Sequence, residues 1–179
     1  SLLEGENLNP NEKLIANLDN ACREVGFFLV KGHGISFEDL QQLRDMSAQF
    51  FALPQADKAD VAMSKGGKAW RGWFPLGGEL TSGKKDGKEG YYFGSEGSSD
   101  DPRPLHGRNL FPKHDDDKEV NLKGAVLKYM EKATKLARVL LRGISAALSL
   151  PITTFEDTIT RDPTVLFRIF HYPPSDEYE

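Results

Sequence analysis

The sequence lacks the features that mark secreted, membrane-spanning or nucleic-acid-binding proteins. Its single cysteine, Cys22, excludes an internal disulfide, and we expect it to be a small buried core residue in a reducing compartment. No apolar run approaches the roughly 20 residues that a membrane-spanning helix needs. Lysines and arginines are scattered and the net charge is −4, so no basic surface for nucleic acid is indicated. These absences predict a cytoplasmic protein with neither membrane nor nucleic acid as a partner.

The composition is that of a globular chain, with 39% hydrophobic and 28% charged residues in 179. This length fits one domain, or one domain plus part of another. Apolar residues recur at helical spacing in several segments, and capping residues stand before them. Five helices are predicted. Their approximate ranges are Asn9 to Gly26, Ser36 to Pro54, 55–63, 118–149 and 153–159.

Two further segments have a different character. Residues 27–31, "FFLVK", are typical of a short, largely buried strand. Residues 65–114 are rich in glycine, proline and aromatic side chains, which predicts a long ordered loop of the kind that surrounds active sites, with short strands around Asp86-Gly87.

The last apolar segment, "TVLFRIFHY", predicts a strand that Pro173 and Pro174 end. Side chains alternate along a strand, so one face carries Leu166, Arg168, Phe170 and Tyr172, and the other carries Phe167, Ile169 and His171. A cation and a phenol on one face can both donate hydrogen bonds to a carboxylate ligand. The same residues are also compatible with an ordinary exposed strand face.

Five segments occur in an order that resembles a known family. They are "ACREVGFFLVKGHGI", "FFALPQADK", "RGWFPLGGELTSGKKDGKEGYYFG", "PLHGRNLFP" and "LFRIFHYPP". Together they resemble the isopenicillin N synthase-like family of iron(II)/2-oxoglutarate-dependent dioxygenases, over about residues 10 to 174. The resemblance implies an α+β fold, in which an N-terminal helical region with short strands packs on a double-stranded β-helix, or jelly roll.

By the same resemblance, residues 1–162 form the N-terminal dioxygenase region and residues 163–179 begin a truncated jelly-roll catalytic domain. The family binds iron through a His-x-Asp…His triad, which normally follows the proline pair. We therefore expect the chain to be an internal segment with no catalytic and no metal-binding residues of its own. Its packing partner would be the remaining jelly-roll segment of the same protein.

The resemblance also suggests site residues. Tyr172 matches a tyrosine that contacts 2-oxoglutarate, and Arg168 shares its face. Arg71, Trp73, Phe74 and Phe170 are the expected substrate contacts. The alternative for Arg71 is a structural role, in which it bridges loops to Glu79 or Glu89.

Other polar residues are expected to be structural. Glu89 is predicted to hold the loop, and His171 is predicted to be structural or partly exposed. His114-Asp115-Asp116 formally matches His-x-Asp, but acidic residues there precede a long helix and favour its first turn.

The function implied is that of an oxidoreductase using Fe(II) and 2-oxoglutarate on a small organic substrate. Two alternatives stay open. One is a non-catalytic binding or scaffold module that retains only the N-terminal half. The other is an oxidase of the isopenicillin N synthase type, which does not use 2-oxoglutarate.

Overall fold

The computed structural model describes residues 11–113 and 121–174, and these form two compact units. The first, here called the helical unit, contains residues 11–36 and 131–163. The second, the sheet unit, contains the remaining described residues, including the strand before the proline pair. That strand pairs with a strand from the glycine- and aromatic-rich region. The division of the chain at 162/163 into an N-terminal region and the start of a jelly roll stays a prediction.

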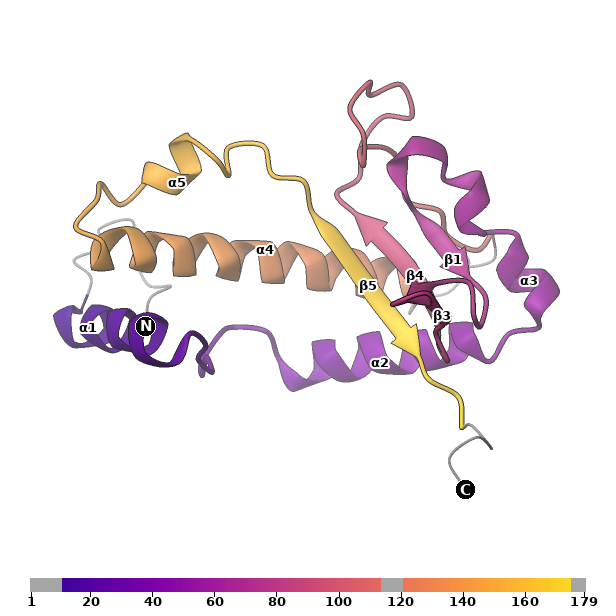
Figure 1. The fold of residues 1–179 in the computed structure, drawn as a ribbon, viewed down its shortest axis with the longest axis horizontal. Helices are drawn as coiled ribbons and strands as arrows, with labels where there is room; N and C mark the ends of the chain where they lie inside the picture. The colour runs from indigo at the N-terminus through magenta and orange to yellow at the C-terminus, as the bar shows by residue number, and fades with distance from the viewer. Residues whose placement is uncertain (1–10, 114–120, 175–179) are drawn as a thin grey trace. The chain divides into compact units, whose positions relative to one another are not determined.

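A three-stranded antiparallel sheet organises the sheet unit (Figure 1). Its strands are β1 (Gly72–Phe74), β4 (Glu89–Gly94) and β5 (Leu166–His171), in the order β1-β4-β5. A separate hairpin, formed by β2 (Leu80–Thr81) and β3 (Lys84–Lys85), lies in the chain segment that connects β1 to β4. The central strand β4 is buried along its length, since it has a partner on each side.

One face of the sheet is covered by helices. Helix α2 (Phe37–Phe51) and the start of α4 (Leu122–Ala147) contribute to a core with the sheet's inward residues. This core contains Phe50, Phe51, Val61, Trp73, Tyr91, Phe93, Leu122, Val126 and Met130. The short helix α3 (Gln55–Ala59) and the 3-10 turns Met63–Lys65 and Gly67–Ala69 lead from α2 to β1.

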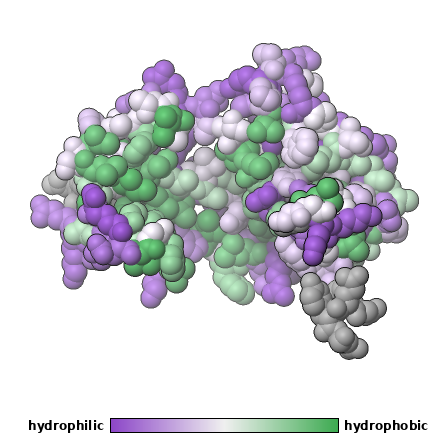
Figure 2. Space-filling model, in the orientation of Figure 1, coloured by the Kyte–Doolittle hydropathy of each residue, from purple (hydrophilic) through white to green (hydrophobic). Residues whose placement is uncertain are grey.

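The helical unit is built on α1 (Glu12–Asn20), the later part of α4 and α5 (Thr154–Asp157). Arg142 on α4 forms a two-pronged ion pair with Glu156 on α5, with N–O distances of 2.7 and 2.9 Å. Figure 2 shows apolar side chains gathered over the region where Figure 1 draws α1 and α5. Several large apolar residues of this unit are exposed, including Val25, Phe27 and Ile159.

The helix predictions are confirmed in existence and position. Asn11 caps α1 by accepting hydrogen bonds from the amides of Lys13 and Leu14, whereas Asn9 lies outside the described residues. The helix continues as a π-helical turn (Ala21–Val25) and ends at Gly26, whose φ of 82° suits glycine. The described part of the long helix starts at Leu122, close to the predicted start.

Two sequence predictions are wrong. Residues 27–31 form no strand, and the Leu29 side chain is 93% exposed, because no described segment pairs with them. Cys22 is exposed instead of buried, because it lies in the π-helical turn after α1, in which no residue is buried. Over the described residues, no helix combines the length and the apolar character needed to cross a membrane.

Candidate functional site

Strand β5 presents alternate side chains to the two faces of the sheet, as its sequence predicts. Its pairing with β4 sets Tyr91 opposite Ile169 and Tyr92 opposite Arg168. Tyr91 and Ile169 belong to the core cluster, which defines the core face. The opposite face, here called the aromatic face, carries Phe74, Tyr92, Arg168, Phe170 and Tyr172.

Phe170 stands at the centre of the aromatic face. Its ring centroid lies 6.4 Å from those of Phe74 and Tyr92 and 6.3 Å from that of Tyr172. The backbone opposite Phe170 is Gly90. A β-carbon at Gly90 would lie 2.4 Å from Phe74 Cζ and 2.7 Å from Phe170 Cδ1. Glycine is therefore required there for the two rings to pack across β4.

Two cations lie over the rings of this face. The guanidinium carbon of Arg168 is 5.3 Å from the Phe170 centroid and 5.7 Å from that of Tyr92. Lys88 Nζ is 4.8 Å from the Phe170 centroid. Such distances allow cation–π attraction. Arg168 is exposed, and among the described residues no carboxylate forms an ion pair with it.

Arg168 and Tyr172 are separated along the strand with Phe170 between them. Four residues of extended chain place their Cα atoms about 13 Å apart. Tyr172 is 64% exposed.

Lys88 belongs to a polar cluster at the edge of the aromatic face. Its Nζ is 2.5 Å from Asp86 Oδ2 and 3.5 Å from Glu79 Oε2, and the hydrogen bond to Asp86 is the main factor that raises the pKa of Lys88. Tyr92 donates its hydroxyl hydrogen bond to Glu79. Burial, followed by this contact with Glu79, raises the pKa of Tyr92. Lysine and tyrosine thus both stay protonated at neutral pH.

On the core face, Glu89 accepts hydrogen bonds from three different elements. Its Oε2 is 2.8 Å from Lys58 Nζ of α3 and 2.8 Å from Trp73 Nε1 of β1. Its Oε1 is 2.9 Å from His171 Nδ1 of β5. Burial alone would raise the pKa of Glu89, but the hydrogen bonds from Lys58, His171 and Trp73 together hold it below its ordinary value. Glu89 is therefore an ionised structural anchor, in agreement with the role predicted for it.

Arg71 is buried, with 2% of its surface exposed. Its guanidinium donates to the carbonyl oxygens of Phe93 (3.2 Å) and Leu105 (2.8 Å), and burial lowers its pKa. It thus joins β4 to the loop at Leu105 through backbone carbonyls, whereas the structural alternative expected contacts with Glu79 or Glu89. A substrate contact by Arg71 stays a prediction.

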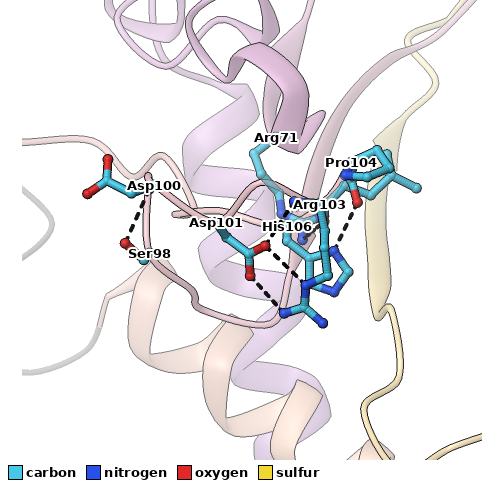
Figure 3. Close-up of polar contacts among 8 residues, drawn as sticks. Arg71, Ser98, Asp100, Asp101, Arg103, Pro104 and His106 are labelled. Carbon is cyan, nitrogen blue, oxygen red and sulfur yellow. Dashed lines mark hydrogen bonds and ion pairs between the residues drawn. The ribbon is translucent and has the colours of Figure 1, made fainter.

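The loop that Arg71 holds is internally braced (Figure 3). Arg103 forms a two-pronged ion pair with Asp101, and Asp100 donates its amide to Ser98 Oγ. His106 Nδ1 lies 2.9 Å from the carbonyl oxygen of Pro104. These contacts stabilise the chain beside Arg71, and none of them involves a residue of the aromatic face.

The other predicted substrate contacts lie on different faces. Phe74 and Phe170 are neighbours on the aromatic face. Trp73 lies on the core face, where its indole N–H is engaged by Glu89. Both Trp73 and Phe74 are buried. The structure therefore brings Phe74 and Phe170 together with Arg168 and Tyr172, and separates Trp73 from them.

In residues 11–113 and 121–174, no group of three or more His, Cys, Asp or Glu side chains could hold a metal ion. His114 and Asp116, the formal His-x-Asp match, lie outside the described residues. The donor set of the aromatic face, by contrast, has the chemistry to hold a carboxylate such as those of 2-oxoglutarate.

Comparison with known proteins identifies the family. A family model described as non-haem dioxygenase in morphine synthesis N-terminal matches residues 2–114. The chain therefore belongs to the 2-oxoglutarate-dependent dioxygenase family, as its sequence motifs predict.

Curated relatives agree with this assignment. A probable iron/ascorbate oxidoreductase of Dictyostelium discoideum is 45% identical over 90% of this chain and 47% of its own length. A 1-aminocyclopropane-1-carboxylate oxidase of Dictyostelium mucoroides is 33% identical over 93% of this chain and 46% of its own. The chain thus spans about half the length of the curated relatives it matches.

Solved structures share the fold. A protein of the 2OG-Fe(II) oxygenase family from Caulobacter crescentus superposes with a TM-score of 0.75 at 24% identity. The match covers 92% of this chain and 53% of that protein. The mixed helix-and-sheet architecture is therefore that of a 2OG oxygenase.

Sequence reasoning missed several residues of the site. Lys58, Lys88 and Tyr92 each contact a predicted residue, but they come from other elements. Only the register of β4 against β5 places Tyr92 opposite Arg168. The sequence did contain one usable signal: side chains alternate along "GYYFG", so Tyr91 and Tyr92 could have been assigned to opposite faces of a strand.

Proposed function

We propose that the whole protein is an iron(II)/2-oxoglutarate-dependent dioxygenase that oxidises a small organic substrate. The proposal is supported by family membership and by one observation of this chain, namely that Arg168 and Tyr172 project from the aromatic face with no carboxylate paired to Arg168 among the described residues. In this proposal β5 is the first strand of a jelly roll, and the rest of that jelly roll packs with it and supplies the iron ligands.

The residues of the aromatic face would bind and orient ligands. Tyr172 would donate its hydroxyl hydrogen bond to a carboxylate of 2-oxoglutarate, and Arg168 would hold an anionic group farther along the strand. Phe74 and Phe170 would form an apolar wall that excludes water. When bound with iron and dioxygen, 2-oxoglutarate supplies the electrons for oxygen activation.

A substrate with a carboxylate would suit this face. The Dictyostelium mucoroides relative is named a 1-aminocyclopropane-1-carboxylate oxidase, and that name denotes a small substrate that bears a carboxylate. Because Arg168 and Tyr172 lie about 13 Å apart at their Cα atoms, cosubstrate and substrate carboxylates could each have a donor. We further propose that the enzyme works in the cytoplasm, without membrane or nucleic acid partners.

The first prediction tests the contact made by Tyr172. In the full-length protein, Tyr172→Phe should raise the KM for 2-oxoglutarate by about two- to tenfold, the range that the loss of one hydrogen bond covers. Steady-state turnover at varied 2-oxoglutarate concentrations measures this change. Tyr129→Phe is the matched control, because Tyr129 packs against Phe167, on the core face.

Three outcomes would contradict parts of the proposal. An unchanged KM in Tyr172→Phe would refute the tyrosine contact. Turnover that needs iron but not 2-oxoglutarate would favour an oxidase of the isopenicillin N synthase type. A full-length protein without iron-dependent turnover on any small carboxylate substrate would favour a non-catalytic module.

A further inference from the structure

The pair Glu89 and His171 forms the last rung of the β4–β5 ladder. Glu89 begins β4, His171 ends β5, and the two residues are register partners. Tyr172 follows at once, and Pro173 and Pro174 lie beyond it. Because a proline has no amide hydrogen to donate to a neighbouring strand, this rung is the final sheet attachment before Tyr172 in the described chain.

This last rung is joined by side chains as well as by strand pairing. The Glu89 side chain is 10% exposed and that of His171 is 44% exposed, with 2.9 Å between Oε1 and Nδ1. Lys58 and Trp73 hold the other carboxylate oxygen, so Glu89 cannot swing away with His171. Glu89 is therefore held in place by other elements, and it in turn holds the end of β5 through His171.

A closed circuit of contacts surrounds this rung. Lys58 Nζ also donates to the carbonyl oxygen of Phe51, at 2.9 Å. The Phe51 ring lies 5.5 Å from the imidazole of His171, centroid to centroid. Helix α2, helix α3, β4 and β5 are thus linked in a ring of contacts through Phe51, Lys58, Glu89 and His171. Movement of His171 would disturb both a hydrogen bond and a ring contact.

We propose that Glu89 and His171 are positioning residues for Tyr172. The Glu89–His171 hydrogen bond holds the end of β5 from the core face. Because Tyr172 is the next residue, this bond also sets the direction in which the Tyr172 side chain projects from the aromatic face. The inference rests on the proposed contact between Tyr172 and 2-oxoglutarate. Neither Glu89 nor His171 touches the ligand, since both lie on the far side of the sheet from the aromatic face.

The experiment compares two His171 variants in the full-length protein. His171→Leu removes the donor, and His171→Asn keeps an N–H donor close to the position of Nδ1. His171→Leu should raise the KM for 2-oxoglutarate about two- to tenfold, with kcat at saturating cosubstrate changed less than about twofold because Tyr172 itself is intact. His171→Asn should restore a KM within about twofold of the wild type.

A second readout does not involve activity. Amide hydrogen exchange of β5, followed by mass spectrometry without ligands, should be faster in His171→Leu than in the wild type or in His171→Asn. A purely structural role would lower the thermal midpoint of His171→Leu and leave the KM unchanged. That result would overturn the proposal, as would equal KM values for the Leu and Asn variants.

The two proposals fail in different ways. An unchanged KM in Tyr172→Phe refutes the ligand contact, whatever the His171 variants do. A raised KM in Tyr172→Phe, together with unchanged exchange of β5 and unchanged KM in His171→Leu, refutes the positioning role alone. Glu89→Gln is not the primary variant, because it leaves Lys58 buried without its charge partner.

Discussion

At the scale of single residues, Gly90 decides whether the aromatic face can exist. It lies between Phe74 and Phe170, each on a neighbouring strand, and both rings occupy the space that a side chain would take. A glycine inside a strand is ordinarily a weakness, since it packs nothing and loses more conformational freedom on folding. Here that cost is offset by the contact of two rings across the central strand.

The prediction at this scale concerns Gly90→Ala. The added methyl group would overlap Phe74 and Phe170, so we expect the free energy of unfolding to fall by about 1–3 kcal/mol. Urea denaturation measures the change. Gly87→Ala is the control, because a β-carbon at Gly87 meets nothing within 4 Å, and its effect should stay within about 0.5 kcal/mol. Equal stability of both variants would mean that the rings move aside at no cost.

The residue scale also shows what the sequence could predict about the site. Alternation along "LFRIFHY" placed Arg168, Phe170 and Tyr172 on one face correctly, because a strand's period of two follows from backbone geometry alone. The same alternation predicted that His171 points to the opposite face, and His171 does lie on the core face. The partners could not be predicted, since Lys58 and Glu89 are 31 positions apart in the chain and meet only after packing.

At the scale of elements, Glu89 connects α3, β1 and β5 through one ionised carboxylate. Because folding lowers its pKa, the folded state favours the ionised form, and this contribution to stability is present above the unfolded value of about 4.3. The contribution is lost progressively as the pH falls below that value toward the folded pKa. Protonation would weaken the hold on all three elements together.

The prediction at this scale compares the wild type with Glu89→Gln at several pH values. At pH 7 the variant should be less stable by about 3–5 kcal/mol, because Lys58 keeps a buried charge without its partner. The difference should narrow as the pH falls below about 4, because the unfolded wild type then binds a proton at Glu89 and the ionised folded state loses its relative advantage. Urea unfolding at pH 7, 5 and 3.5 gives the three differences.

Glu131→Gln is the control for that series. Glu131 pairs with Lys135 at 2.5 Å on an exposed helix surface, where the pair contributes little. Its variant should show a small difference at every pH. A Glu89→Gln difference that is constant with pH would show that the carboxylate's charge is not what joins the elements.

Elements also mark the limit of what the sequence could predict about the fold. Helices α1, α2 and α4 were found because their apolar periodicity and caps are local signals. The strand predicted at 27–31 failed, because an apolar run becomes a strand only when another strand pairs with it. Strand order and register are likewise set by distant segments, so the sheet β1-β4-β5 was beyond local reasoning.

At the scale of the whole molecule, the chain matches about half the length of its curated relatives. Its described residues contain donors for a carboxylate but no group of three or more metal-ligating side chains.

The prediction at this scale concerns iron binding by the 179 residues alone. Under anaerobic conditions with iron(II), the isolated chain should bind well below one equivalent, measured by elemental analysis after desalting. The double variant His114→Ala and Asp116→Ala should bind no less than the wild-type chain. One equivalent of iron that disappears in the double variant would contradict the expectation that this His-x-Asp match is no metal site.

The position of β5 has a consequence for how the protein can be extended. Among the described strands it has a neighbour only on its β4 side, so the backbone amides and carbonyls along its other side pair with no described strand. Every second residue of β5 contributes one amide and one carbonyl to this edge, which is the pattern that a further strand pairs with. The same strand that displays Arg168 and Tyr172 therefore also offers the line along which a further strand can join, which would bring new side chains directly beside both donors.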